Sequence, residues 1–173
     1  MAGHRFVVPV ARLRRTAGGS WAVRRSGPIP DLVVSGTAVP EGAEVTADVV
    51  LEAIAGGIAV HGRVLAPWTG TCRRCAAPVG GTLDVAVREL YTERGDGEET
   101  YPLAHDEVDL EPLARDAVLL ELPVAPLCRP DCRGLCPVCG ADWNEGPCSC
   151  EARRDPRWAA LDVLRGTEPG DGT

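Results

Sequence analysis

Eight cysteines in four close pairs are the residues of this sequence best suited to chemistry. The pairs are Cys72/Cys75, Cys128/Cys132, Cys136/Cys139 and Cys148/Cys150. A short spacing lets a tight turn aim both sulfurs of a pair at one ion, and tetrahedral zinc takes two such pairs. In a reducing compartment, clustered thiols are more often metal ligands than structural disulfides. The sequence therefore predicts two structural zinc ions, with all eight cysteines as ligands.

The four pairs can be combined into two tetrahedral sites in three ways. We favour a local site built from Cys136, Cys139, Cys148 and Cys150, because a loop of about a dozen residues costs little entropy to close. The remaining cysteines, Cys72, Cys75, Cys128 and Cys132, would then join two distant parts of the chain. Gly140 follows the Cys136-Pro137-Val138-Cys139 turn at a position that favours a positive φ.

Two other kinds of thiol chemistry compete with structural zinc. Thiolates alone also suit an iron–sulfur cluster. The arginines of Cys72-Arg73-Arg74-Cys75 would lower a thiol pKa, as in redox proteins, but this pair is predicted at a hairpin tip and not at a helix N-terminus. Catalytic groups are otherwise hard to find, since His4, His61 and His105 are scattered singly and no phosphate-binding glycine loop occurs. We expect no enzyme and no catalytic residues.

The charge of the chain is unevenly distributed. Its net charge of −7 argues against a protein that coats nucleic acid over its whole surface. Residues 1–30 nevertheless hold six arginines and no acid, whereas residues 93–121 are strongly acidic. Further arginines flank the cysteines, where they either offset thiolate charge or form a phosphate-contacting face: Arg73, Arg74, Arg129, Arg133, Arg153, Arg154 and Arg157.

The hydrophobic pattern predicts an α+β fold: an antiparallel β-sheet with one or two helices and a C-terminal cysteine-rich zinc-binding segment. Period-two alternation marks strands at 45–52, 58–64 and 83–87, with a short strand at 68–72 and two further short ones at 6–10 and 32–34. The polar stretch 93–106 is expected to be a mobile loop.

Two helices are expected in the second half of the chain. Asp109 is a suitable N-cap for the first, Pro112 is tolerated in its first turn, and Pro123 ends it. The second would begin at Asp155-Pro156 and stop at Gly166. We therefore divide the chain into a sheet with a helix (1–127), a zinc-binding segment with its terminal helix (128–166) and a disordered tail (167–173). Neither a signal peptide nor a membrane span is evident, which indicates a cytoplasmic protein.

Four stretches of the sequence resemble one known family. They are residues 68–75 (WTGTCRRC), 109–112 (DLEP) with the following Leu122-Pro123, 126–140 (PLC through GLCPVCG) and 155–161 (DPRWAAL). Together they resemble the actinobacterial form of the YceD family, the large ribosomal RNA subunit accumulation proteins. Similar actinobacterial proteins tend to carry H-x-H where this chain has Cys148-Ser149-Cys150, an exchange that zinc tolerates.

The resemblance implies a bacterial cytoplasmic factor that supports the synthesis, processing or stability of large-subunit ribosomal RNA. Its partners would be ribosomal RNA or a large-subunit assembly particle, and a ribosomal protein, with no membrane and no small-molecule substrate. Two alternatives stay open: a thiol redox or zinc-responsive regulator, and a protein-interaction module that docks through its acidic or basic segment.

Overall fold

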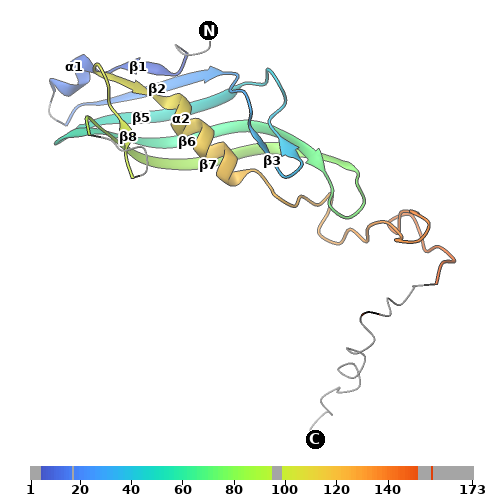
Figure 1. The fold of residues 1–173 in the computed structure, drawn as a ribbon. Helices are drawn as coiled ribbons and strands as arrows, with labels where there is room; N and C mark the ends of the chain where they lie inside the picture. The colour runs from blue at the N-terminus through green and yellow to red at the C-terminus, as the bar shows by residue number, and fades with distance from the viewer. Residues whose placement is uncertain (1–4, 17, 95–98, 152–156, 158–173) are drawn as a thin grey trace, which may run out of the picture.

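The computed structural model describes residues 5–16, 18–94, 99–151 and 157. Within them the chain forms a mostly antiparallel sheet with two helices, which confirms the predicted fold class (Figure 1). In chain order the elements are β1 (Val7–Pro9), α1 (Ala11–Arg14), β2 (Ser20–Gly27), β3 (Val33–Val34), β4 (Thr37–Ala38), β5 (Val45–Ile54), β6 (Gly57–Thr71), β7 (Pro78–Thr92), β8 (Tyr101–Pro102), β9 (Glu107–Asp109) and α2 (Leu110–Glu121).

The strand β6 lies at the centre of the larger sheet. Along one side it pairs first with β5 and then, at Thr69 and Gly70, with β4; along the other it pairs with β7 from end to end. The expected strands 58–64 and 68–72 are therefore one strand of 15 residues. Pro67 lies between the β5 and β4 pairings, so this side of β6 carries no partner strand at the proline.

The edge strand β2 was not predicted. It pairs with β5 along eight residues, but only Gly27 at its end is buried. A strand with so little buried surface needs no alternating apolar pattern, and its Arg24-Arg25 pair is typical of a solvent-facing edge.

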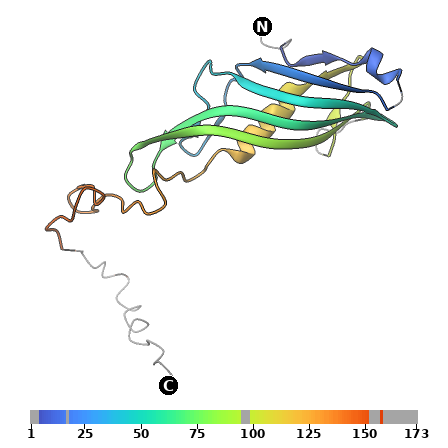
Figure 2. The same ribbon diagram turned by 180° about the vertical axis from the view of Figure 1, so that it is seen from behind.

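One face of the sheet carries the hydrophobic core. Alternate residues of β5, namely Val45, Ala47, Val49 and Leu51, are buried there, and α2 lies diagonally across the strands (Figure 1). Viewed from behind, the opposite face of the long strands has no helix across it (Figure 2). The alternation of buried and exposed residues along β5 follows from this one-sided cover.

The helix α2 begins and ends where the sequence predicts. The Asp109 carboxylate accepts a hydrogen bond of 3.0 Å from the backbone N–H of Glu111, as an N-cap should, and Leu122 closes the last turn before Pro123. After the helix, the buried Thr37 hydroxyl donates to the Pro123 carbonyl oxygen at 3.0 Å. The chain therefore leaves α2 tied to β4, at the same end of the sheet as the β6–β7 hairpin tip.

The stretch 93–106, expected to be a mobile loop, is partly structured where it is described. Tyr101–Pro102 form β8, and the Tyr101 ring stacks on Tyr91 with centroids 5.1 Å apart. Glu93 and Asp106 both bind the Arg14 guanidinium at the end of α1. Contacts with residues far away in the sequence thus fix the two ends of this polar segment.

Some predictions fall outside the described residues. The expected second helix (155–166), apart from Arg157, and the tail 167–173 lie beyond them, so the threefold division of the chain stays a prediction. No helix in the described part of the chain is long and apolar enough to cross a membrane.

We expect Asp109→Ala to lower the free energy of unfolding by about 1 kcal/mol, because it removes the side-chain acceptor at the start of α2. Urea unfolding measures the change. Asp109→Ser should recover most of the loss, and Glu107→Ala, at an exposed position of β9, should have little effect. Equal losses in the alanine and serine variants would contradict a capping role.

Candidate metal centres

The structure brings the eight cysteines together in two groups of four. We call Cys72, Cys75, Cys128 and Cys132 the first centre, and Cys136, Cys139, Cys148 and Cys150 the second centre; in each, all sulfurs lie within 4.8 Å of one another. These are the sets that loop-closure entropy favours. The structure thus places together every cysteine that was predicted as a ligand.

The sulfur positions fit a single tetrahedral ion. A zinc–sulfur bond of about 2.3 Å puts neighbouring sulfurs about 3.8 Å apart. In the first centre, the Cys72 and Cys132 sulfurs are 3.8 Å apart and those of Cys75 and Cys128 are 3.6 Å apart, far beyond a disulfide bond. Either group could therefore hold a metal ion.

The two C-x-x-C turns, Cys72–Cys75 and Cys136–Cys139, have the same backbone hydrogen bonds. The N–H of the residue after the second cysteine donates to the carbonyl oxygen of the first cysteine at 2.9 Å in both turns. The N–H of the first cysteine donates to Ala77 at 2.7 Å in one turn and to Ala141 at 2.8 Å in the other. Two segments of unrelated sequence thus adopt one local fold that points paired sulfurs the same way.

The residue after the second cysteine has a positive φ in both turns. It is Gly140 in the second centre, with φ 76°, as the sequence predicts, but Ala76 in the first, with φ 58°. An L-residue in this left-handed conformation costs about 1–2 kcal/mol relative to an allowed one. The first turn therefore adopts the same conformation as the second although alanine disfavours it.

The first centre joins the β6–β7 hairpin tip to the chain that follows α2. Cys72, Cys75 and Cys132 are buried and pack with Leu127 and Val79 in a small apolar cluster of their own. Backbone contacts reinforce the junction, because the Arg73 N–H donates to the Pro126 carbonyl oxygen at 2.9 Å. The Arg74 guanidinium donates to the Cys132 carbonyl oxygen at 2.7 Å.

The second centre is more exposed and has little apolar support. Cys139 is exposed. The apolar side chains of Leu135 and Val138, in the same segment, retain 38% and 50% of their accessible surface. Polar contacts to sulfur take the place of packing: the Trp143 indole N–H donates to the Cys148 sulfur at 3.4 Å, and the Val138 N–H to the Cys136 sulfur at the same distance.

Each centre contains one thiol that ionises easily and one that does not. The backbone N–H of Cys75 lowers the pKa of Cys72 to about 6, and the Trp143 indole lowers the pKa of Cys148 to about 6. The hydrogen bond with the Cys132 sulfur raises the pKa of Cys128 to about 12, and that with the Cys139 sulfur raises the pKa of Cys150 to about 12. A cation bound by all four sulfurs would displace the remaining protons.

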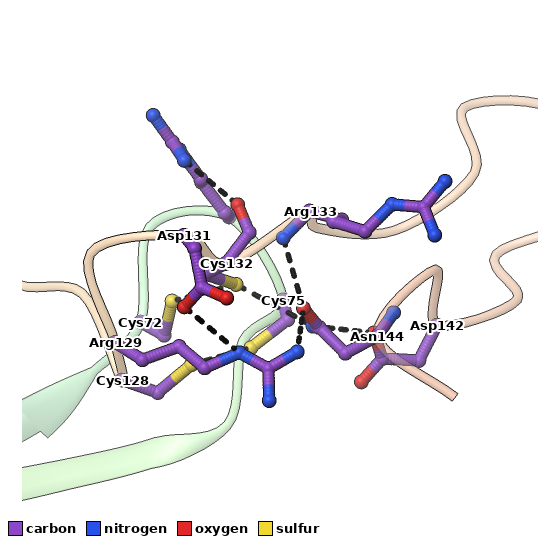
Figure 3. Close-up of polar contacts among 10 residues, drawn as sticks. Cys72, Cys75, Cys128, Arg129, Asp131, Cys132, Arg133, Asp142 and Asn144 are labelled. Atoms are coloured by element: carbon purple, nitrogen blue, oxygen red, sulfur yellow. Dashed lines mark hydrogen bonds and ion pairs between the residues drawn. The ribbon is translucent and has the colours of Figure 1, made fainter. Parts of the chain in front are cut away.

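A single asparagine lies between the two centres. Asn144 belongs to the loop that separates Cys139 from Cys148, yet its amide nitrogen lies 3.4 Å from the Cys132 sulfur of the first centre (Figure 3). Its amide oxygen accepts from the Arg129 guanidinium at 2.8 Å and from the Arg133 backbone N–H at 2.9 Å. Sequence reasoning missed this residue, because nothing in its sequence neighbours indicates contact with a sulfur outside its own loop.

The centres also touch through the backbone at Gly134. Its φ is 78°, and a β-carbon there would lie 2.9 Å from the Arg74 carbonyl oxygen, so a larger residue would push the segment away from the hairpin tip. The N–H of Leu135 donates to that oxygen at 3.2 Å, and the Trp143 N–H donates to the Gly134 carbonyl oxygen at 2.9 Å. The loop of the second centre is thus seated directly on the first.

The arginines beside the cysteines divide into two kinds. Arg74 and Arg129 use their guanidinium groups within the protein, Arg129 also in an ion pair of 3.4 Å with Asp131. Arg73 and Arg133 are exposed, and their guanidinium groups have no hydrogen bond or ion pair within the described part of the chain. Arg157 is exposed and has an interaction of its own, whereas Arg153 and Arg154 lie outside the described residues.

Comparison with known proteins identifies the family of the chain. Residues 60–165, from β6 through both cysteine groups, match the model of the family described as "Large ribosomal RNA subunit accumulation protein YceD". The chain belongs to the YceD family. An uncharacterized protein of Mycobacterium tuberculosis (strain H37Rv) is 37% identical to it over 171 residues, covering 94% of this chain and 83% of the relative.

Other relatives match shorter parts of the chain. The Bacillus subtilis protein YlbN, also uncharacterized, is 26% identical over 68% of this chain and 70% of its own. A chloroplastic maize protein named "Large ribosomal RNA subunit accumulation protein YCED homolog 1" is 39% identical over 31% of this chain and 18% of its own. No solved structure matches the chain.

We expect Ala76→Gly to stabilise the protein by about 1 kcal/mol, because glycine adopts the left-handed conformation without the steric cost that alanine bears. The matched exchange, Gly140→Ala, should destabilise the second centre by a similar amount. Denaturant unfolding in the presence of zinc measures both changes. Opposite signs are required; loss of stability in both variants would show that the two turns do not share one conformation.

Proposed function

We propose that this protein is a non-enzymatic cytoplasmic factor that supports the accumulation of large-subunit ribosomal RNA, and that its two cysteine groups hold structural zinc. The observation that carries the functional part is the family match, which runs from β6 through both centres. The metal part rests on eight free cysteines gathered in two four-sulfur groups.

The chemistry of the centres supports a structural role for the metal. Zinc bound by four sulfurs keeps no open position for a substrate or an activated water, whereas catalytic zinc has three protein ligands and one exchangeable position. In the first centre, zinc would hold the hairpin tip to the chain after α2 through Cys72, Cys75, Cys128 and Cys132. In the second centre it would fold a segment that cannot bury a core of its own.

A basic surface beside the first centre supports contact with RNA phosphates. Arg73 projects from the hairpin tip and Arg133 from the segment between the centres, and both are exposed. Because both residues lie next to a cysteine of the first centre, bound metal would hold their backbones in place. A chain of net charge −7 can attract a polyanion only through such a local patch.

The exposed cysteines favour a second candidate function, a thiol redox or zinc-responsive regulator. Cys128 of the first centre and Cys139 of the second are exposed, so an oxidant could reach one sulfur in each group. Intact-protein mass spectrometry with and without mild oxidant separates the two functions. Reversible loss of both metal ions together with disulfide formation would favour the regulator.

We expect the purified protein to contain two zinc ions per chain and Cys136→Ser to retain one. The variant should also become protease-sensitive in residues 134–151 while the sheet persists, since metal binding supplies the folding free energy of a segment without a core. Elemental analysis and limited proteolysis measure the two effects. Ser149→Ala, at an exposed position between two ligands, is the matched control. Iron with visible absorbance would contradict the zinc assignment.

We expect the protein to co-sediment with large-subunit particles and the double variant Arg73→Ser/Arg133→Ser to bind ribosomal RNA more weakly. The slope of log affinity against log salt should become shallower by roughly two, since each lost phosphate contact removes about one counterion. Zinc content should not change. Arg63→Ser, which removes a guanidinium paired with Asp84 on the sheet, is the control. An unchanged slope would exclude this surface as the contact site.

A further inference from the structure

We propose that Asn144 couples the two metal centres: it donates a hydrogen bond to a sulfur of the first centre from the loop that separates the two cysteine pairs of the second centre. The inference rests on the proposal that both cysteine groups bind zinc. It assigns Asn144 as a positioning residue, so that loss of metal from the second centre weakens the first.

The contacts of Asn144 fix the orientation of its amide group. The Arg133 backbone N–H and the Arg129 guanidinium can only donate, so the group that faces them must be the amide oxygen. The amide nitrogen then faces the Cys132 sulfur at 3.4 Å and the Asp142 carboxylate at 2.6 Å. Figure 3 shows these contacts converging on one side chain beside the first centre.

Consecutive residues of this loop serve different centres. Trp143 donates its indole N–H to the Cys148 sulfur of the second centre, and Asn144 donates its amide N–H to the Cys132 sulfur of the first. The two residues are adjacent in the chain, so a shift of the loop backbone displaces both donors. The loop between Cys139 and Cys148 therefore transmits the state of one centre to the other.

The hydrogen bond from Asn144 to the Cys132 sulfur stabilises negative charge at the first centre. Four thiolates around one divalent cation carry a net charge of −2, and a sulfur with a donor holds this charge more easily. Asn144 also orients the Arg129 guanidinium, which lies beside the same centre (Figure 3). Outer contacts of this kind change metal affinity by about 10–100-fold when they are removed.

The different exposure of the cysteines in the two centres determines which centre loses metal first. The first centre has three buried cysteines, whereas the second has one, Cys136, so chelators and oxidants reach the second centre first. Once the second centre is empty, the loop loses the contacts that its sulfurs provide and holds Asn144 less firmly against Cys132, so zinc leaves the first centre sooner. By linkage, metal in the first centre also favours metal in the second.

A double-mutant cycle on full-length zinc-loaded protein tests the coupling. The four proteins are wild type, Asn144→Ala, Cys148→Ser/Cys150→Ser and the triple variant, and the readout is the rate at which a coloured chelator removes zinc. Cys72→Ser/Cys75→Ser identifies which kinetic phase belongs to the first centre. We expect Asn144→Ala to speed zinc loss from the first centre about 10-fold. Emptying the second centre should do the same, and the triple variant should lose zinc no faster than either.

Cobalt substitution supplies a readout that a purely structural role would not change. The sulfur-to-cobalt charge-transfer absorption of the first centre should shift in Asn144→Ala, because the donor to Cys132 is gone. Glu145→Ala, in the same turn and exposed, should leave both the absorption and the release rate as in wild type.

The outcomes distinguish a failure of the coupling from a failure of the zinc assignment on which the coupling rests. A wild-type protein that binds no metal overturns the zinc assignment. Two bound zinc ions with an unchanged release rate in Asn144→Ala, or with rate effects that multiply in the triple variant, overturn the coupling alone.

Discussion

The pairing of β6 with β7 is the constraint on which the rest of the structure depends. These strands remain in register from Gly57 opposite Thr92 to Thr71 opposite Pro78. At about 3.4 Å per residue, the hairpin carries its tip about 50 Å from the open end. The core strand β5 and the short β4 are aligned on β6, and α2 packs against β5, β6 and β7. An interruption of this one pairing would separate the cysteine turn at the tip from the core.

The molecule combines two ways of stabilising a chain. From β1 to α2, apolar side chains buried on one face of the sheet provide the stability, and no metal is needed to explain the fold. Between Pro123 and Glu151 the large apolar residues become sparse, and sulfur groups with their hydrogen-bond donors take over. The first centre lies at the boundary between these regimes, since it has both a small apolar cluster and a four-sulfur group.

Local signals predicted local structure well and long-range structure poorly. The N-cap Asp109, the terminating Pro123 and the glycine after Cys139 each act within a few residues, so the sequence predicts them directly. The grouping of the cysteines followed from loop length alone. By contrast, β2 depends on pairing with β5, and the stretch after Glu93 depends on Arg14, far away in the sequence. The contact of Asn144 with Cys132 exists only once two loops are packed together, which no periodicity reveals.

The order of the cysteine pairs along the chain also affects how the protein is made. A ribosome releases Cys72 and Cys75 first, and β7 follows them, so the hairpin can pair before the next cysteine emerges. Cys128 and Cys132 emerge next, ahead of the last four cysteines. The last two pairs appear together and find each other through a short loop. If the two groups bind zinc as proposed, synthesis from the N-terminus to the C-terminus favours the observed grouping over the other two. A chain released from denaturant with all eight thiols exposed at once would lack this advantage.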